Sequence, residues 1–323
     1  MRVRVETGGR VHIGFQNLSL AHERLYGGVG LAIDEPRAVV EAEPASTVEC
    51  DDAVVATYAE RACSELGVNG ARVEVCERLP RHVGLGSGTQ LALATLTAVA
   101  RAHDVALTVR KRAPALGRGG RSGVGVATFE AGGFVVDAGH PTERFTTDPP
   151  AAGSWTVPEV VARRRVPDDW RLLLVLPDAA PGRSGDDEDE SIRAVVEDAD
   201  PGVADELAGV LVRRLLPAVA EGRLDAFGDA VGAFGRLNGA WYADQQGGVY
   251  RPPAGRIIDR LSDCPAVRGL GQSSWGPAVY GVTDASMAAD ATADARAALS
   301  ELGVDARVQV VEPRNEGARV ETL

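Results

Sequence analysis

The sequence predicts an α+β protein built from two domains. The chain has 323 residues, 45% of them hydrophobic and 25% charged, which is enough for a sizeable buried core. Its first half is rich in short alternating apolar runs, whereas its second half alternates apolar strands with long amphipathic helices. Residues 146–167, between the two halves, are rich in proline and loop-forming residues. We therefore divide the chain into domains at residues 1–160 and 161–323.

The first half predicts strands and two helices in an α+β order. Alternating or short apolar runs predict strands over residues 3–15, 27–35, 37–43 and 71–79. One helix is expected over residues 53–66, capped by Asp51 or Asp52, and a second over residues 87–104. Residues 123–140 (GVGVATFEAGGFVVDAGH) predict a hairpin whose turn is Gly132-Gly133.

The second half predicts a split βαβ sandwich. It opens on the strand WRLLLVLPD and an acidic loop, GDDEDES, and it ends on a glycine-rich strand, a helix over residues 285–303 and a strand over residues 306–312. Between these lie helices over residues 204–222, 223–244 and 255–263. The acidic run Asp186 to Glu190 suggests a metal site, but a solvated loop leading into a helix N-terminus explains it better.

The charge and the composition exclude several classes of protein. A formal net charge of −12 is unfavourable for binding a nucleic-acid backbone. Lys111 is the only lysine, and this predominance of arginine in an acidic chain predicts a high-salt cytoplasm or a GC-rich genome. The four cysteines form no CxxC pair and the five histidines form no zinc motif, so we expect reduced thiols and no zinc. The chain starts on a strand, without a signal peptide or a membrane-length apolar run, and we expect it in the cytoplasm.

A glycine-rich turn before an apolar helix is the main candidate for a binding site. In RLPRHVGLGSGTQLALATL, the turn around Gly84, Gly86 and Gly88 directs backbone N–H groups to whatever lies in front of the helix, which predicts an anion site. The alternative is that the glycines only let a helix start close to a sheet. A Walker A loop is excluded because Lys111 lies elsewhere, and a dinucleotide-binding fingerprint does not fit. FVVDAGHPT, with the single acid Asp137, is a weak match to the ribosyl-pyrophosphate loop of phosphoribosyltransferases.

Three motifs in order resemble those of the GHMP superfamily, which includes galactokinase, homoserine kinase and mevalonate kinase. Residues 80–88 (PRHVGLGSG) resemble its second motif, residues 10–15 (RVHIGF) the first, and residues 269–282 (GLGQSSWGPAVYGV) the third. The resemblance implies a two-domain fold, with an N-terminal α+β domain like ribosomal protein S5 and a C-terminal ferredoxin-like α/β sandwich.

One departure from the kinases indicates a different reaction. The catalytic aspartate of GHMP kinases falls on Gly125 in RSGVGVATFEAGG, and residues 107–116, where several of these kinases place a magnesium-binding glutamate, contain no acid. The chain instead resembles, over nearly its full length, the β-ribofuranosylaminobenzene 5′-phosphate synthases, an archaeal non-kinase family. The stretches RLYGGVGLAIDEP, GLGSGTQLALA and WYADQQGGVY contribute to this resemblance.

The resemblance implies a transferase of a methanopterin-type pathway. It would join phosphoribosyl pyrophosphate to 4-aminobenzoate or 4-hydroxybenzoate and release pyrophosphate and carbon dioxide. Such chemistry requires anchored anions and a positioned ring rather than a strong base. An ATP-dependent GHMP kinase and a non-catalytic binding protein remain the alternatives. We expect a homodimer with Mg²⁺ as cofactor, and no nucleic-acid or membrane partner.

The candidate site residues follow from these roles. The pyrophosphate would bind the backbone of Gly84, Leu85, Gly86, Ser87, Gly88 and Thr89, with Ser87 near magnesium. Arginine clamping and catalysis would involve Arg10, His12, Arg118, Arg121 and Ser122. The ring would be held by Tyr26, Gly27, Gly28, Trp241, Tyr242, Gln245, Gln246, Ser273, Ser274 and Trp275. Solvated loop arginines, a core histidine and ordinary aromatic packing are the alternative interpretations of these residues.

Overall fold

The computed structural model describes residues 1–148, 150–151, 153–180 and 186–323, without the side chains of residues 186–189. Its strands are β1 (Val3–Asn17), β2 (Arg24–Pro44), β3 (Ala71–Glu77), β4 (Phe134–Asp137), β5 (His140–Pro141), β6 (Val160–Arg164), β7 (Trp170–Pro177), β8 (Arg268–Gln272), β9 (Val279–Asp284), β10 (Ala306–Val311) and β11 (Arg319–Thr322). Its longer helices are α1 (Ala53–Leu66), α2 (Ser87–Ala102), α4 (Val124–Ala131), α5 (Asp186–Asp198), α6 (Pro201–Val210), α8 (Leu224–Trp241), α10 (Ala254–Leu261) and α11 (Ala288–Leu302). The short helical segments are α3 (Val109–Arg112), η1 (Ala113–Leu116), η2 (Leu211–Leu215), α7 (Leu216–Glu221) and α9 (Ala243–Gln246).

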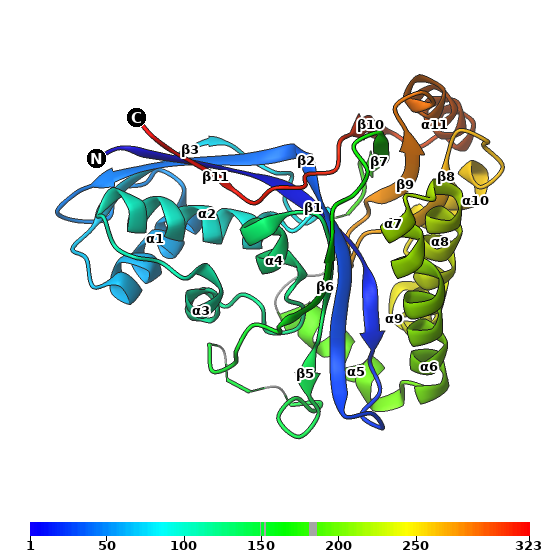
Figure 1. Ribbon diagram of the computed structural model, residues 1–323, viewed down its shortest axis with the longest axis horizontal. Coiled ribbons are helices and arrows are strands. Elements are labelled where there is room, and N and C mark those ends of the chain that lie inside the picture. The colour runs from blue at the N-terminus through cyan, green and yellow to red at the C-terminus, as the bar shows by residue number, and fades with distance from the viewer. Residues whose placement is uncertain (149, 152, 181–185) are drawn as a thin grey trace.

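A large antiparallel sheet forms the N-terminal half (Figure 1). Among the described residues it has seven strands, ordered β11-β1-β2-β4-β6, with β3 and β5 also paired to β2. The two strands expected between residues 27 and 43 are one continuous strand, β2, which pairs with β1 along most of its length. Helices α1 and α2 pack together on this sheet, and Asp52 caps α1 by accepting a hydrogen bond from the N–H of Val55 at 2.8 Å.

A smaller antiparallel sheet, ordered β10-β7-β9-β8, lies between two layers of helices in the C-terminal half. The side chains of β7 alternate, so that Leu172 and Leu174 enter the main core, which also contains residues of α8, whereas Leu173 and Val175 pack with residues of α10 and α11. Phe227 on α8 contacts both Phe134 of β4 and Trp170 of β7, at ring-centroid distances of 5.8 and 4.9 Å. One hydrophobic core therefore joins the two halves.

One local prediction was wrong, and a second was right only in part. The segment expected to be the first arm of a hairpin is α4, a short buried helix that ends at Gly132, where φ is 62°, and β4 follows directly. A short apolar run buried all round does not distinguish a strand from a helix by its periodicity. The acidic run Asp186 to Glu190 was expected as a solvated loop leading into a helix N-terminus, and it forms that N-terminus, since α5 begins at Asp186.

No helix in the described ranges is long and apolar enough to cross a membrane. The division of the chain into domains at residue 160 stays a prediction. Two strand pairings cross this division or lie beside it. β6, at the division, pairs with β4 of the large sheet, and the chain returns after β10 to place β11 beside β1. This last strand lies beyond the one expected to end the chain.

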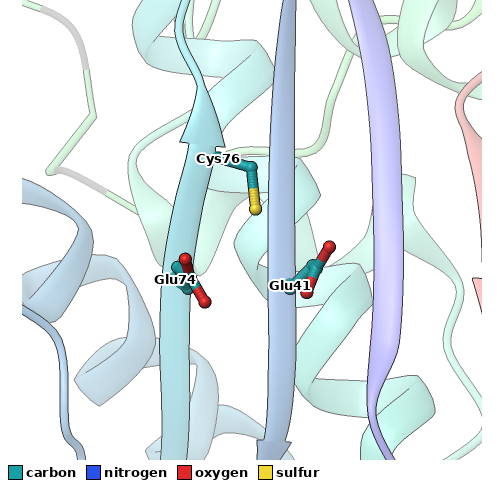
Figure 2. A group of neighbouring side chains, drawn as sticks. All are labelled: Glu41, Glu74 and Cys76. Carbon is teal, nitrogen blue, oxygen red and sulfur yellow. The ribbon is translucent and has the colours of Figure 1, made fainter. Parts of the chain in front are cut away.

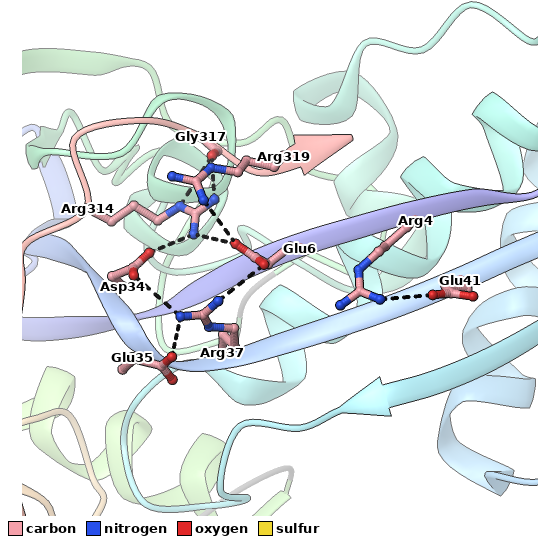
Figure 3. Close-up of polar contacts among 9 residues, drawn as sticks. All are labelled: Arg4, Glu6, Asp34, Glu35, Arg37, Glu41, Arg314, Gly317 and Arg319. Atoms are coloured by element: carbon pink, nitrogen blue, oxygen red, sulfur yellow. Dashed lines mark hydrogen bonds and ion pairs between the residues drawn. The ribbon is translucent and has the colours of Figure 1, made fainter. Parts of the chain in front are cut away.

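A network of ion pairs fastens the returning C-terminal segment to the large sheet (Figure 3). The guanidinium of Arg314, only 5% exposed, lies 2.9 Å from Asp34 and 3.3 Å from Glu6. The backbone of Arg314 also accepts from the N–H of Gly133 and donates to the carbonyl of Ala32. Arg319 pairs with the same Glu6 at 3.6 Å, but its side chain is 59% exposed.

We predict that Arg314→Met lowers the free energy of unfolding by about 2–4 kcal/mol, because it leaves the carboxylates of Glu6 and Asp34 without their enclosed partner. Urea denaturation measures the change. Arg319→Met is the control, since an exposed pair contributes at most about 1 kcal/mol. Equal losses in the two variants would contradict this assignment.

Candidate active site

The glycine-rich turn leads into α2 with its backbone in a conformation that favours glycine. Gly84 and Gly86 have φ values of 97° and 77°, and α2 begins immediately afterwards at Ser87. Gly86 is the N-cap residue and no side chain caps the helix. The N–H groups of Ser87 and Gly88 in the first turn are therefore available to an anion in front of the helix.

The hydroxyl of Ser273 holds this turn in place from the other half of the chain. It donates to the carbonyl of Gly84 at 2.7 Å and accepts from the backbone N–H of His12 at 3.0 Å, and the residue is fully buried. A Cβ on Gly84 would lie 2.1 Å from the Ser273 carbonyl oxygen, and one on Gly276 would lie 2.0 Å from the backbone of Val83. The turn between β8 and β9 and the turn before α2 can approach this closely because neither glycine has a side chain.

The turn forms one wall of a cavity of about 450 Å³. Its polar lining comes from Arg10, Tyr58, Arg78, Arg81, His82, Ser87, Thr89, Arg118 and Ser274, with the backbone of Gly84, Gly86 and Gly88. Four of these residues are arginines, and none of the described lining residues is a carboxylate. In a chain with a net charge of −12, this concentration of positive charge marks a site for a strongly anionic ligand.

Two of the arginines lie against the helix N-terminus, and the missing side chain of Gly86 leaves room for Arg10. A Cβ on Gly86 would lie 3.0 Å from Cγ of Arg10, and one on Gly88 would lie 3.4 Å from Nη1 of Arg118. Arg10 also donates to the carbonyl of Gly84. The guanidinium of Arg118 donates to the hydroxyl of Tyr58 and lies 5.2 Å from the centroid of its ring. Arg10, Arg118 and the N-terminus of α2 therefore face the same cavity.

A smaller cavity of about 50 Å³ adjoins the first at Ser274 and Trp275, which line both. Its walls are His12, Ile13, Gly14, Phe15, Gly235, Asn238, Gly239, Tyr242, Gln246, Val249, Tyr250, Gln272, Ser274 and Trp275. Asn238 of α8 fixes the wall by accepting from the N–H of Phe15 at 2.9 Å and donating to the carbonyl of the same residue. The rings of Tyr242 and Trp275 meet edge to face at 4.6 Å. Aromatic side chains therefore form part of the walls of this cavity.

Two partly buried hydrogen bonds link His12, through Ser122, to Asp137. Nε2 of His12 lies 3.2 Å from the hydroxyl of Ser122, which in turn lies 3.2 Å from the carboxylate of Asp137. Burial, and then the charge of Arg10, lowers the pKa of His12 well below its usual value, so the imidazole is neutral at pH 7. Burial raises the pKa of Asp137 to about 6, against the opposing effect of three backbone N–H donors.

The remaining predicted residues lie elsewhere. Tyr26 and Arg121 line a separate small cavity, and Tyr26 and Gly27 line another. Gly28 lies beside Ser122 rather than beside either cavity of the site, and the side chain of Leu85 is buried in the main core. Trp241 packs against the core, and neither it nor Gln245 lines a described cavity of the site.

Three charged residues near the site were not expected from the sequence. Arg78 and Arg81 stand directly before the glycine turn, so their place in RLPRHVG was a sufficient signal. Asp137 was considered only as part of a weak phosphoribosyl motif, yet it is fully buried and bonded to Ser122, the partner of His12. Its position depends on the pairing of β4 with β2, which no local pattern reveals.

Within the described residues, one group of potential metal ligands is found, and it lies outside this site (Figure 2). Glu41 of β2 approaches Glu74 and Cys76 of β3. Arg2 and Arg4 already pair with Glu41, at 2.6 and 3.1 Å, and balance its charge. We therefore assign no metal to this group.

Comparisons with known proteins agree with this geometry. The family model for the GHMP kinases N terminal domain matches residues 52–133. The beta-ribofuranosylphenol 5'-phosphate synthase of Methanothermobacter thermautotrophicus is 33% identical over 333 residues, covering 97% of both chains. Its counterpart in Archaeoglobus fulgidus is 33% identical over 335 residues, covering 99% of both. Mevalonate pyrophosphate decarboxylase from Streptococcus pyogenes has a similar fold, with a TM-score of 0.68, 11% identity and coverage of 98% of this chain and 97% of that one. The GHMP fold expected from the three motifs is confirmed.

We predict that Gly84→Ala abolishes the binding of pyrophosphate, because its Cβ would displace the turn from Ser273. Gly117→Ala is the matched control, since Gly117 also has a positive φ, of 72°, but faces open space. The control should lose only about 1 kcal/mol of stability through backbone strain. Thermal unfolding with and without pyrophosphate compares the two variants. Pyrophosphate protecting Gly84→Ala as well as wild type would rule out the turn as the anion site.

Proposed function

The chain belongs to the family of beta-ribofuranosylphenol 5'-phosphate synthases, and from this premise we propose that it condenses phosphoribosyl pyrophosphate with 4-hydroxybenzoate or 4-aminobenzoate. A carbon–carbon bond forms between the ribosyl carbon and the ring carbon that carries the carboxylate. Pyrophosphate and carbon dioxide leave. The product would serve a methanopterin-type pathway, and a homodimer stays our prediction for the assembly.

The observation that carries this proposal is the arginine-lined cavity at the N-terminus of α2. Pyrophosphate offers several charged oxygens, and guanidinium groups bind such oxygens in pairs. Arg10 and Arg118 lie against the first turn of α2, while Arg78 and Arg81 line the same cavity. As the bond from the ribosyl carbon to pyrophosphate breaks, negative charge develops on the leaving group, and these fixed positive charges stabilise it.

The adjoining cavity supports an aromatic acceptor. It shares Ser274 and Trp275 with the arginine-lined cavity, so a ring bound there would lie next to a ribosyl group whose pyrophosphate binds the arginines. Aromatic walls hold the ring by its faces and edges and fix its orientation. The volume of about 50 Å³ is smaller than a benzoate, so we infer that the side chains around Trp275 move when the acceptor binds.

Magnesium fits this site as part of the substrate. The described lining of the larger cavity offers the hydroxyls of Ser87 and Thr89 to a metal ion, but no carboxylate. Mg²⁺ usually binds one or two carboxylates together with substrate phosphates. The residues therefore do not fit a resident metal. We propose that Mg²⁺ enters as the complex of phosphoribosyl pyrophosphate, beside Ser87.

A GHMP kinase is the second candidate, favoured by the match of the N-terminal family model. Gly125 opposes it, because this glycine stands where the kinases carry their catalytic aspartate. A Cβ at Gly125 would lie 3.1 Å from Cγ2 of Thr89, so a larger side chain would crowd the first turn of α2. The chain therefore has neither the carboxylate nor ready space for it.

We predict that the protein releases labelled carbon dioxide from carboxyl-labelled 4-hydroxybenzoate or 4-aminobenzoate when phosphoribosyl pyrophosphate and magnesium are present. Release should depend on both substrates and should match pyrophosphate formation one to one. The assay is run at low and high salt because the chain is acidic. Binding of both ligands without release at any salt concentration would leave a non-catalytic protein, and phosphate transfer from ATP to a hydroxyl would establish the kinase.

We also predict that Arg118→Met weakens pyrophosphate binding by about 10- to 100-fold, as expected for loss of a charge-assisted contact. Isothermal titration measures the affinity. Arg213→Met, on the helical segment η2 and outside both cavities, is the control and should bind as wild type does. Equal affinities of Arg118→Met and wild type would remove Arg118 from the anion site.

A further inference from the structure

The two hydrogen bonds that link His12, Ser122 and Asp137 have a fixed direction of donation. A serine hydroxyl donates one hydrogen and accepts at two lone pairs. Ser122 accepts from the N–H of Val124 at 3.1 Å and donates to Oδ2 of Asp137 at 3.2 Å. Its second lone pair faces Nε2 of His12 at 3.2 Å. Since the hydroxyl's one hydrogen is already used, His12 must donate to it, so the hydrogen of the neutral imidazole is on Nε2.

The carboxylate of Asp137 is built to stay ionised and in place. Asp137 is fully buried, and it accepts from the N–H of Gly123 at 2.7 Å and from the N–H of Gly139 at 2.9 Å. The backbone of Gly28 donates to it as well. Such donors favour the ionised form, and with a pKa of about 6 the carboxyl is ionised at pH 7.5.

Gly28 of β2 leaves space for the hydrogen-bonded residues Ser122 and Asp137. A Cβ on Gly28 would lie 2.1 Å from the Ser122 hydroxyl and 2.8 Å from the Asp137 carboxylate. Gly28 was expected to let a planar substrate approach. Its contacts show instead that it lets Ser122 and Asp137 approach the strand behind His12.

The second ring nitrogen, Nδ1, makes no hydrogen bond within the described part of the chain and is not fully enclosed. His12 itself lines the smaller cavity, two residues along β1 from Arg10, which lines the larger one. An imidazole with hydrogen on Nε2 presents a lone pair on Nδ1. Because His12 lines the smaller cavity, we infer that this lone pair is a hydrogen-bond acceptor for a ligand bound there.

We propose that Asp137 and Ser122 are positioning residues that hold His12 as the Nε2–H tautomer, and that Nδ1 takes the proton of the acceptor's para hydroxyl during carbon–carbon bond formation. The proposal rests on the function proposed above. With 4-aminobenzoate, the same nitrogen accepts a hydrogen bond from the amino group.

The step balances without any further reactant. The ring carbon bearing the carboxylate attacks the ribosyl carbon, and the electron pair of the breaking carbon–oxygen bond leaves with pyrophosphate. The para O–H bond breaks, its proton moves to Nδ1, and its electron pair becomes the second bond of a ring carbonyl. When carbon dioxide leaves, the pair of its bond restores the aromatic ring, and the oxygen takes the proton back from Nδ1. His12 ends in its initial state.

Ser122→Ala is the first test, because it removes the link while leaving the backbone donors to Asp137. We expect kcat with 4-hydroxybenzoate to fall about 10- to 100-fold, as for loss of a general base's support, while the KM for phosphoribosyl pyrophosphate stays within about threefold. Ser262→Ala, at the exposed end of α10, is the control and should keep the wild-type kcat. An unchanged kcat in Ser122→Ala would overturn the proposal.

A substrate analogue identifies the group that His12 serves. The hydroxyl of 3,5-difluoro-4-hydroxybenzoate is acidic enough to be ionised at the assay pH, so it needs no base. The ratio of wild-type to Ser122→Ala kcat should therefore approach one with this acceptor. A ratio as large as that with 4-hydroxybenzoate would overturn the para-hydroxyl assignment and indicate a ribose hydroxyl as the donor to Nδ1.

The tautomer is measured directly by ¹⁵N NMR of the labelled protein, with the His12 signals identified by their loss in His12→Gln. Wild type should show hydrogen on Nε2. Asp137→Asn should shift the hydrogen toward Nδ1, because the amide can donate to Ser122, whose hydroxyl then donates to Nε2. Replacing a carboxylate that orients a histidine can lower kcat by about 10⁴. Hydrogen on Nδ1 in wild type would overturn the assigned roles of Ser122 and Asp137, whatever the measured kcat. If wild type shows the Nε2–H tautomer but no turnover, the proposed function is contradicted, while the positioning of His12 by Ser122 and Asp137 is supported.

Discussion

The site depends on the contact between two glycine turns that lie almost two hundred residues apart. Ser273 bonds both the carbonyl of Gly84 and the backbone of His12, and Gly276 packs directly on the turn before α2. The arginine-lined cavity therefore exists only when the C-terminal half is packed on the N-terminal half. The shared core around Phe227 and the ion pairs of Arg314 serve the same requirement, since they hold the halves together.

Sequence patterns predicted those parts of the fold whose signals are local. The helix over residues 53–66 has an aspartate cap, an apolar face and a glycine at its end, and the structure has it at the same bounds. The segment at residues 124–131 failed because a short helix buried on all sides has no polar face to reveal its period. β2 was divided in two because Pro36 interrupts a strand whose continuity comes from pairing with β1.

Local and long-range signals also separate the two parts of the site, the glycine-rich turn and the residues behind His12. The glycine-rich turn before α2 could be recognised because the backbone needs glycine at Gly84 and Gly86, where φ is positive. The contribution of Asp137 depends on strand pairing that brings it behind His12 from 125 positions away, and no pattern near either residue reports it. Tyr26 and Arg121 were plausible as local motifs, but the fold turns them toward other cavities.

Charge completes this account. The chain is acidic, yet it gathers arginines around one helix N-terminus and excludes carboxylates from that cavity's described lining. The most direct test of separate sites for the anion and the ring is a crystal structure with pyrophosphate and benzoate. Benzoate is the acceptor without its para group. Pyrophosphate should lie between the N–H groups of Ser87 and Gly88 and the guanidinium groups of Arg10 and Arg118, with the benzoate ring beside Trp275. Pyrophosphate bound away from α2, or both ligands in one cavity, would contradict the account.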